Sequence, residues 1–256
     1  MIFDEALSRS YDDWFQTPSG RYIDAREKAF ILSLMSPRPG ERLLDVGCGT
    51  GEHLRMFHEK GCEVAGLDAS PFMIARAREK LGSRAELHEG SAEDLPFSDN
   101  AFDHVVLITA LEFTEDPALA VSEAIRVCRN RVFFGLLNPY SLLAVQRGLE
   151  GRLRDTVYNR ARLLTLRKLS GMIRDRLGAT PLTWGSVILF PSSWYPAAGM
   201  LEERLPAVKN PFGAFMGLSF PMRFRYRTVQ DAIRDPFKMK ANQHNPMHGA
   251  VREMER

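Results

Sequence analysis

Between Arg42 and Leu137, short aliphatic or β-branched runs alternate with amphipathic stretches. A parallel sheet whose crossover connections are helices produces this alternation. Strands are expected at residues 43–46, 63–67, 84–88, 104–108 and 131–137, with helices at residues 51–60, 70–80 and 117–129. Ser70 followed by Pro71 is typical of a helix start, and Gly61 of a helix end. The pattern therefore predicts a doubly wound α/β fold.

The rest of the chain is less regular. A helix is expected over residues 162–177, and the apolar, aromatic segments 182–190 and 212–220 are interpreted as two final strands. Residues 223–256 are polar, basic and weakly periodic, which predicts a docked arm or a partly disordered tail. Residues 1–222 are therefore expected to form one domain that precedes this tail.

Composition excludes several protein classes. The 256 residues are 45% hydrophobic and 26% charged, which excludes disordered, collagen-like and small disulfide-stapled chains. A formal net charge of +2 is too small for a general nucleic-acid binder, so no nucleic-acid partner is expected. The three cysteines lack metal-ligand spacing, and acids stand where a signal peptide would carry Lys or Arg. We expect a cytoplasmic protein without a metal site, and one that is not integral to a membrane, because the longest apolar run, residues 105–111, is too short.

The segment Asp45-Val46-Gly47-Cys48-Gly49-Thr50-Gly51 lies where the first strand turns into a helix. Glycines permit positive φ and leave the backbone open to a ligand. Glu52 stands where a dinucleotide fingerprint has its last glycine, and this disfavours a nicotinamide-dependent oxidoreductase. Asp45 can attract a cationic group, and Asp68 can accept both hydroxyls of a ribose. A cofactor with an ammonium group, a ribose and no phosphate fits this pattern best.

These segments resemble the class I S-adenosylmethionine-dependent methyltransferases, specifically the type 11 group that acts on small molecules. The resemblance runs from about residue 11 to residue 220 and rests on residues 44–51, 66–70, 90–97 and 102–103, in the family's order. It implies a Rossmann-like sheet of seven strands with the last strand antiparallel, and S-adenosyl-L-methionine as the cofactor. It also implies N-terminal lid helices within residues 1–40 and a helical, substrate-covering insertion at residues 138–162.

The resemblance also implies roles for single residues. The cofactor would be bound by Tyr11, Asp45, Gly47, Cys48, Gly49, Gly51, Asp68, Ala69, Met73, Ser91, Ala92, Glu93 and Thr109. In this set the glycines would cradle the methionyl part, Asp45 would organise their loop and Asp68 would hold the ribose. The substrate pocket would include Glu112, Asn138, Tyr140, Tyr158 and Asn159.

Three departures from the family pattern bear on the chemistry. Ser91 stands where relatives usually have Asp, which predicts a weaker hydrogen bond to the adenine amino group. Phe113 replaces a frequent His, and Asn130-Arg131 replaces the usual Gly-Gly, which predicts a changed turn before the fifth strand. No catalytic residue is assigned, because methyl transfer depends on alignment and needs a base only when the nucleophile keeps its proton.

The expected function is methyl transfer to oxygen, nitrogen or carbon of a small acceptor that is anionic or amphipathic. The anionic alternative depends on nine basic and three acidic residues between Arg147 and Arg176, which form either a lid or a solvated helix face. A different hypothesis is a non-catalytic S-adenosylmethionine-binding module that acts through a protein partner. The sequence does not indicate the acceptor or the oligomeric state.

Overall fold

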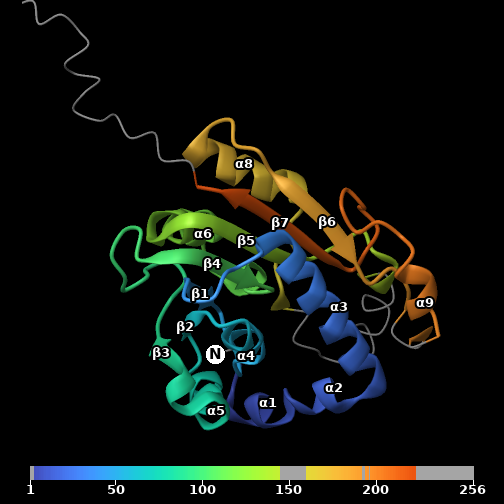
Figure 1. The fold of residues 1–256 in the computed structure, drawn as a ribbon, viewed down its shortest axis with the longest axis horizontal. Coiled ribbons are helices and arrows are strands. Elements are labelled where there is room, and N and C mark those ends of the chain that lie inside the picture. The colour runs from blue at the N-terminus through green and yellow to red at the C-terminus, as the bar shows by residue number, and fades with distance from the viewer. Residues whose placement is uncertain (1–2, 145–159, 192–193, 196, 223–256) are drawn as a thin grey trace, which may run out of the picture. The chain divides into compact units, whose positions relative to one another are not determined.

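The computed structural model describes residues 3–144, 160–191, 194–195 and 197–222 (Figure 1). The strands are Arg42–Val46 (β1), Glu63–Asp68 (β2), Ala85–Glu89 (β3), Phe102–Ile108 (β4), Cys128–Leu137 (β5), Thr183–Val187 (β6) and Phe215–Pro221 (β7). They form one sheet of order β3-β2-β1-β4-β5-β7-β6. Strands β1 to β5 pair in parallel, and β7 runs antiparallel to β5 and β6. The prediction of a seven-stranded, doubly wound sheet with the last strand antiparallel is confirmed.

Helices connect the strands and precede the sheet. They are Glu5–Ser10 (α1), Asp13–Gln16 (α2), Pro18–Met35 (α3), Glu52–Glu59 (α4), Pro71–Leu81 (α5), Pro117–Val127 (α6), Leu166–Leu177 (α8) and Gly199–Glu202 (α9), with 3-10 turns at Gly82–Arg84 (η1) and Leu111–Phe113 (η2). As predicted, Ser70 caps α5 by accepting a hydrogen bond from the Met73 backbone N–H, with Pro71 at the first position. The predicted N-terminal helices are also present.

Alternate residues of the central strands point to opposite faces of the sheet and build two apolar layers. Leu43 and Val106 belong to the layer covered by α3, α4 and α5, whereas Leu44 and Val105 belong to the layer covered by α6 and α8 (Figure 1). Strands β1 and β4 are therefore buried on both faces. This is why their sequences read as nearly continuous apolar runs.

The strand order reverses between β1 and β4, because the chain passes from β1 to β2 on one side and returns to β4 on the other. In open α/β sheets, ligands bind outside the carboxyl ends of the strands at such a switch point. The loops after β1, β2 and β4 meet at this edge.

The start of β5 differs from the prediction. Helix α6 ends at Val127 and β5 begins at Cys128, so Asn130 and Arg131 lie within the strand and form no turn. The register shifts here, since Cys128 pairs with Phe102 but Arg131 pairs with His104. Arg129 donates two hydrogen bonds to the Asp103 carboxylate, at 2.6 and 2.7 Å. The extra residue is accommodated as an irregularity within the strand, beside this ion pair, so the predicted turn was wrong.

Two predicted regions fall largely outside the described residues. These are residues 145–159 of the insertion, which include Tyr158 and Asn159, and the tail at residues 223–256. The separation of a tail from residues 1–222 therefore stays a prediction. Among the helices that the structure describes, none is long and apolar enough to cross a membrane.

Candidate functional site

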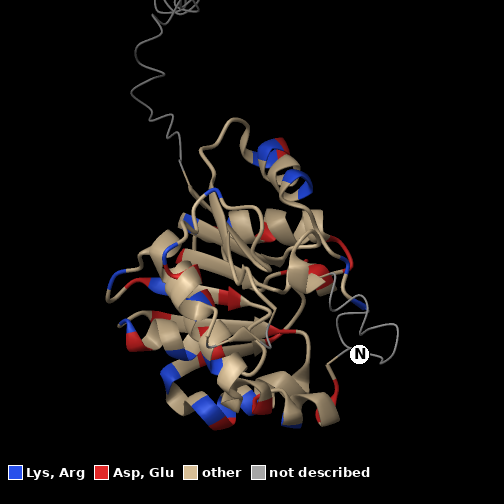
Figure 2. Ribbon diagram, turned by 90° about the vertical axis from the view of Figure 1, so that its right-hand side faces the viewer, with Lys and Arg blue, Asp and Glu red and all other residues tan. Residues whose placement is uncertain are grey.

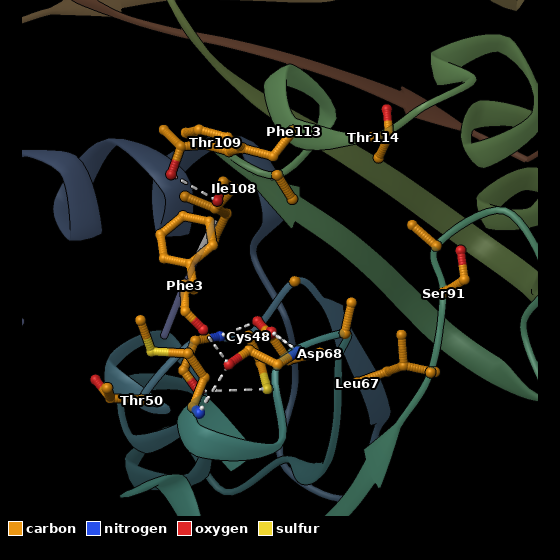
Figure 3. A pocket seen from close by; sticks show the side chains of 18 of the residues that line it. Phe3, Cys48, Thr50, Leu67, Asp68, Ser91, Ile108, Thr109, Phe113 and Thr114 are labelled. Carbon is orange, nitrogen blue, oxygen red and sulfur yellow. Dashed lines mark hydrogen bonds between the residues drawn. The ribbon is translucent and has the colours of Figure 1, made fainter. Parts of the chain in front are cut away.

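A cavity of about 740 Å³ lies at the carboxyl ends of β1, β2 and β4 (Figure 3). It is lined by loops that follow these strands and β3, and by the N-terminal segment. Of the residues that the sequence suggests for a cofactor site, the lining contains Tyr11, Gly47, Cys48, Gly49, Asp68, Ala69, Met73, Ser91, Ala92, Glu93 and Thr109. The fold thus brings together residues that lie far apart in the sequence.

Gly47 and Gly49 both have positive φ but serve different purposes. A Cβ on Gly47 would lie 2.5 Å from Ala110 Cβ, so this glycine allows the loop after β4 to approach closely. A Cβ on Gly49 would meet no atom within 4 Å, and Gly49 lines the cavity. The backbone at Gly49 therefore offers an open surface to a ligand.

Asp68 is held at the end of β2 by two backbone donors. Its Oδ2 accepts from the Gly49 N–H at 2.9 Å and its Oδ1 from the Ser70 N–H at 2.8 Å (Figure 3). Burial raises the pKa of this carboxyl, and the two hydrogen bonds oppose that rise. Each oxygen keeps a lone pair for a further donor, which suits the hydroxyls of a ribose.

Asp45 and Gly51 do not line the cavity. Both carboxyl oxygens of Asp45 are buried without a hydrogen-bond partner, so this side chain makes no bond to the glycine turn. Burial, with a smaller effect from the Asp68 charge, raises the pKa of Asp45 to about 8. A Cβ on Gly51 would lie 2.8 Å from Leu81 Cδ1, so Gly51 faces α5. Asp45 therefore does not face a ligand here, whereas the open backbone at Gly49 and the Asp68 carboxylate, which both line the cavity, fit a cofactor that carries a ribose.

Aromatic side chains form another part of the cavity wall. Phe3, Tyr11 and Phe15 come from the N-terminal segment and Phe113 from η2. The rings of Phe3 and Phe113 meet edge to face with centroids 5.1 Å apart, and those of Tyr11 and Phe15 at 5.9 Å. The sequence indicates the segment around Tyr11 but not Phe3, because nothing in the local pattern predicts that the Phe3 ring packs against η2.

Thr50 and His53 also line the cavity, although neither is among the cofactor residues expected from the sequence. The Nε2 atom of His53 is buried without a partner, and burial, which has the largest effect, lowers its pKa to about 4. This imidazole is therefore neutral at pH 7. The positions of Thr50 within the glycine turn and of His53 just after it could have indicated both residues. The first turn of a helix that follows such a loop faces the ligand.

Thr109 introduces backbone strain at the cavity. Its φ of 50° lies in the left-handed region, which a β-branched residue rarely adopts. The Thr109 N–H donates to the Gly135 carbonyl at 2.8 Å, and its hydroxyl donates to the Ile108 carbonyl at 2.8 Å. Strain of this kind is concentrated at functional sites.

The structure describes three of the suggested substrate residues, and none of these three lines the cavity. Glu112 is fully buried, and its Oε1 accepts from the Leu137 N–H at 2.7 Å. Asn138 donates through Nδ2 to the carbonyls of Pro211 and Gly213, both at 2.8 Å, so it joins the end of β5 to the segment before β7. Tyr140 is 76% exposed.

Glu112 makes stability depend on pH. Burial raises its pKa from 4.5 to about 7, so the folded protein keeps this proton between those values while the unfolded chain releases it. Stability therefore falls as pH rises through this interval, by about 3 kcal/mol in total. Glu112→Gln keeps an acceptor for the Leu137 N–H and cannot ionise. We expect this variant to be about 2–3 kcal/mol more stable than wild type at pH 8 and nearly equal at pH 4.5, by urea unfolding.

The control for this measurement is Glu59→Gln, which changes an exposed carboxylate at the end of α4. It should leave the pH dependence of unfolding as in wild type. Parallel pH profiles for Glu112→Gln and wild type would contradict the assignment.

A family model described as a methyltransferase domain matches residues 44–134, which span β1 to most of β5. Phosphatidylethanolamine N-methyltransferase of Cereibacter sphaeroides is 32% identical over 157 residues, which cover 57% of this chain and 76% of that protein. Demethylmenaquinone methyltransferase of Listeria monocytogenes is 35% identical over 133 residues, covering 49% of this chain and 55% of that protein.

Solved structures are similar as well. A Thermotoga maritima protein described as a SAM-dependent methyltransferase, possible histamine N-methyltransferase, aligns with a TM-score of 0.69 and 23% identity. The alignment covers 87% of this chain and 98% of that one. At this identity, the likeness establishes a shared fold.

Proposed function

The chain belongs to the class I S-adenosylmethionine-dependent methyltransferases and takes S-adenosyl-L-methionine as its cofactor; we propose that its acceptor is a small amphipathic molecule whose reacting group is an amine. One observation carries the acceptor class. Within the described lining, the cavity has aromatic and acidic side chains and neither Lys nor Arg.

The proposed cofactor position follows the lining from β1 to β4. The turn at Gly47 and Gly49 would take the methionyl part and Asp68 the ribose. Ala69 and Met73 would pack on the adenine ring. Ser91 would accept from the adenine amino group, since its hydroxyl already donates to the Glu93 carboxylate and keeps acceptor capacity.

When bound, the cofactor supplies an electrophilic methyl group on a sulfonium. The task left to the chain is to align the nucleophile and exclude water. The aromatic wall of Phe3, Tyr11, Phe15 and Phe113 supports both tasks, because it is largely apolar and its rings pack against one another, Phe3 on Phe113 and Tyr11 on Phe15. A neutral amine carries its own lone pair, so this reaction needs no base before the methyl group moves.

The charge of the lining favours an amine over an anionic acceptor. Asp68, Glu93, Glu115 and Asp116 line the cavity, and carboxylates repel an anionic reacting group. Aromatic faces attract an ammonium group, including the one that N-methylation produces. The relative from Cereibacter sphaeroides is named for N-methylation of a lipid amine, which supports the same class.

The basic stretch at residues 147–176 gives only indirect support for an anionic acceptor. Its described part includes Arg167, Lys168, Arg174 and Arg176 of α8, which are exposed and do not line the cavity (Figure 2). Its remaining basic residues between 145 and 159 lie outside the described residues. We therefore propose that any negative group of the acceptor lies at the end remote from the reacting amine.

Two measurements test this proposal. Calorimetric titration should give one-to-one binding of S-adenosylmethionine and S-adenosylhomocysteine and none of NADH. Formation of S-adenosylhomocysteine should then be faster with dodecylamine than with dodecanoate, an acceptor pair of equal chain length. Faster turnover with dodecanoate would contradict the amine assignment. Cofactor binding without turnover on any acceptor would instead favour the binding-module hypothesis.

A further inference from the structure

Lys80, in the last turn of α5, joins three segments beside the cavity. Its Nζ lies 2.9 Å from Asp12 Oδ2, 2.7 Å from Glu52 Oε1 and 3.2 Å from Thr50 Oγ1. An ammonium group has three N–H donors, so these contacts use all of them. Asp12 belongs to the N-terminal segment, Thr50 to the glycine turn and Glu52 to the start of α4.

Asp12 is held from two sides. Its Oδ1 accepts from the Thr50 hydroxyl at 2.6 Å, while its Oδ2 pairs with Lys80. Thr50 is buried, and the side chains of Asp12 and Lys80 are only 25% and 19% exposed. Shielding of this degree makes the ion pair stronger than a fully solvated one.

This ion pair fixes a segment that forms part of the cavity wall. Asp12 directly follows Tyr11 and precedes α2, which carries Phe15, and both aromatic side chains line the cavity. The start of the same segment is also tied to α5, because the Ser70 hydroxyl donates to the Phe3 carbonyl at 2.7 Å (Figure 3).

Helix α5 therefore holds the N-terminal segment at both ends, through its N-cap residue Ser70 and through Lys80 in its last turn. The N-terminal segment and the glycine turn are the two sides between which the cofactor would lie.

We infer that Lys80 is a positioning residue of the cofactor site. By holding Asp12 against Thr50, it sets the distance between the aromatic wall of the N-terminal segment and the glycine turn. Neither Lys80 nor Asp12 lines the cavity, so both act through Thr50, Tyr11 and Phe15. The inference rests on the cofactor position proposed above. Because Lys80 holds the two sides of the site together, we expect slow release of the bound cofactor.

Lys80→Met should fold, because Glu52 keeps its contacts with Lys28 at 3.4 Å and Arg55 at 2.8 Å. We expect the Kd for S-adenosylhomocysteine to rise about tenfold and its dissociation rate to rise by a similar factor. This is the effect expected from loss of one partly buried charge pair. Asp12→Asn should behave alike. Hydrogen exchange should show that residues 5–16 gain less protection from the ligand in these variants than in wild type.

The matched control is Arg76→Met in the same helix, which also loses an ion pair, with Glu79 at 2.7 Å, but this pair joins two residues of α5 and does not tie α5 to the N-terminal segment. Its Kd should stay within about twofold of wild type, as for exposed pairs. The double variant of Asp12 and Lys80 should bind no more weakly than the weaker single variant, because both changes break the same Lys80–Asp12 ion pair.

Wild-type Kd and release rate in folded Lys80→Met would overturn the inference, as would an equal loss in Arg76→Met or multiplied losses in the double variant. Should Lys80→Met not fold, Asp12→Asn decides the matter, because Lys80 then keeps Glu52 and Thr50. Failure of wild type to bind S-adenosylhomocysteine would refute the proposed cofactor site itself, which is a separate result.

Discussion

Gly49→Val should abolish measurable binding of S-adenosylmethionine while the chain stays folded. The φ of Gly49 is 53°, and a left-handed conformation costs a β-branched residue about 1–2 kcal/mol. The new side chain meets no protein atom within 4 Å of its Cβ, so the unliganded fold can accept it. It instead occupies the space over the turn where the methionyl part would lie. Calorimetry measures the binding, and thermal unfolding followed by circular dichroism measures the fold.

Gly40→Val separates these two effects. Gly40 also has a positive φ, of 81°, and open space around its Cβ, but it lies before β1 and does not line the cavity. This variant should lose similar stability and keep wild-type affinity. Normal cofactor binding by Gly49→Val would refute the role of the glycine turn.

Asp68→Ala should weaken binding of S-adenosylmethionine and S-adenosylhomocysteine at least tenfold. Hydrogen bonds to a charged acceptor contribute about 1.5–3 kcal/mol each, and a ribose offers two hydroxyls to this carboxylate. The change also removes the acceptor for the Gly49 and Ser70 N–H groups, which hold the turn against β2. Both effects act in the same direction. Titration calorimetry provides the two dissociation constants.

The ligand provides the control for Asp68. An S-adenosylhomocysteine analogue that lacks both ribose hydroxyls cannot bond to Asp68. Its affinity should therefore fall much less in Asp68→Ala than that of S-adenosylhomocysteine, and only by the amount caused by loosening of the glycine turn. If the substitution weakens the analogue as strongly as it weakens S-adenosylhomocysteine, then Asp68 does not contact the ribose.

The central part of the fold could be predicted because its signals are local. Strands buried on both faces require apolar runs, and helix starts require caps such as Ser70 with Pro71, so both can be recognised without knowledge of contacts. The start of β5 could not be predicted in this way. The turn was expected from the place where the family has Gly-Gly, whereas the strand start follows from pairing of Cys128 with Phe102 in β4, which is distant in sequence.

In the candidate site, too, features with a local sequence pattern could be predicted, and contacts between distant segments could not. The glycine turn and Asp68 can be identified from the sequence, because positive φ and a strand-end carboxylate leave a recognisable pattern of residue types. Glu112 and Asn138 have residue types that would also suit a substrate pocket, yet the fold uses them to bind backbone groups near the end of β5. Residue type shows that a side chain can form a hydrogen bond, but the tertiary structure determines which group becomes its partner.

The sequence by itself determined the doubly wound α/β layout and a cofactor with a ribose and no phosphate, because these follow from periodicity and from the conformational needs of a few residues. The seven-stranded sheet and S-adenosylmethionine were expected from the family resemblance. Only the tertiary structure decided which side chains form the cavity wall and which contacts hold them in place. Phe3 reaches Phe113, and Lys80 holds Asp12 against Thr50, across long separations in the chain. Such contacts arise from packing of whole elements, and no local pattern encodes them.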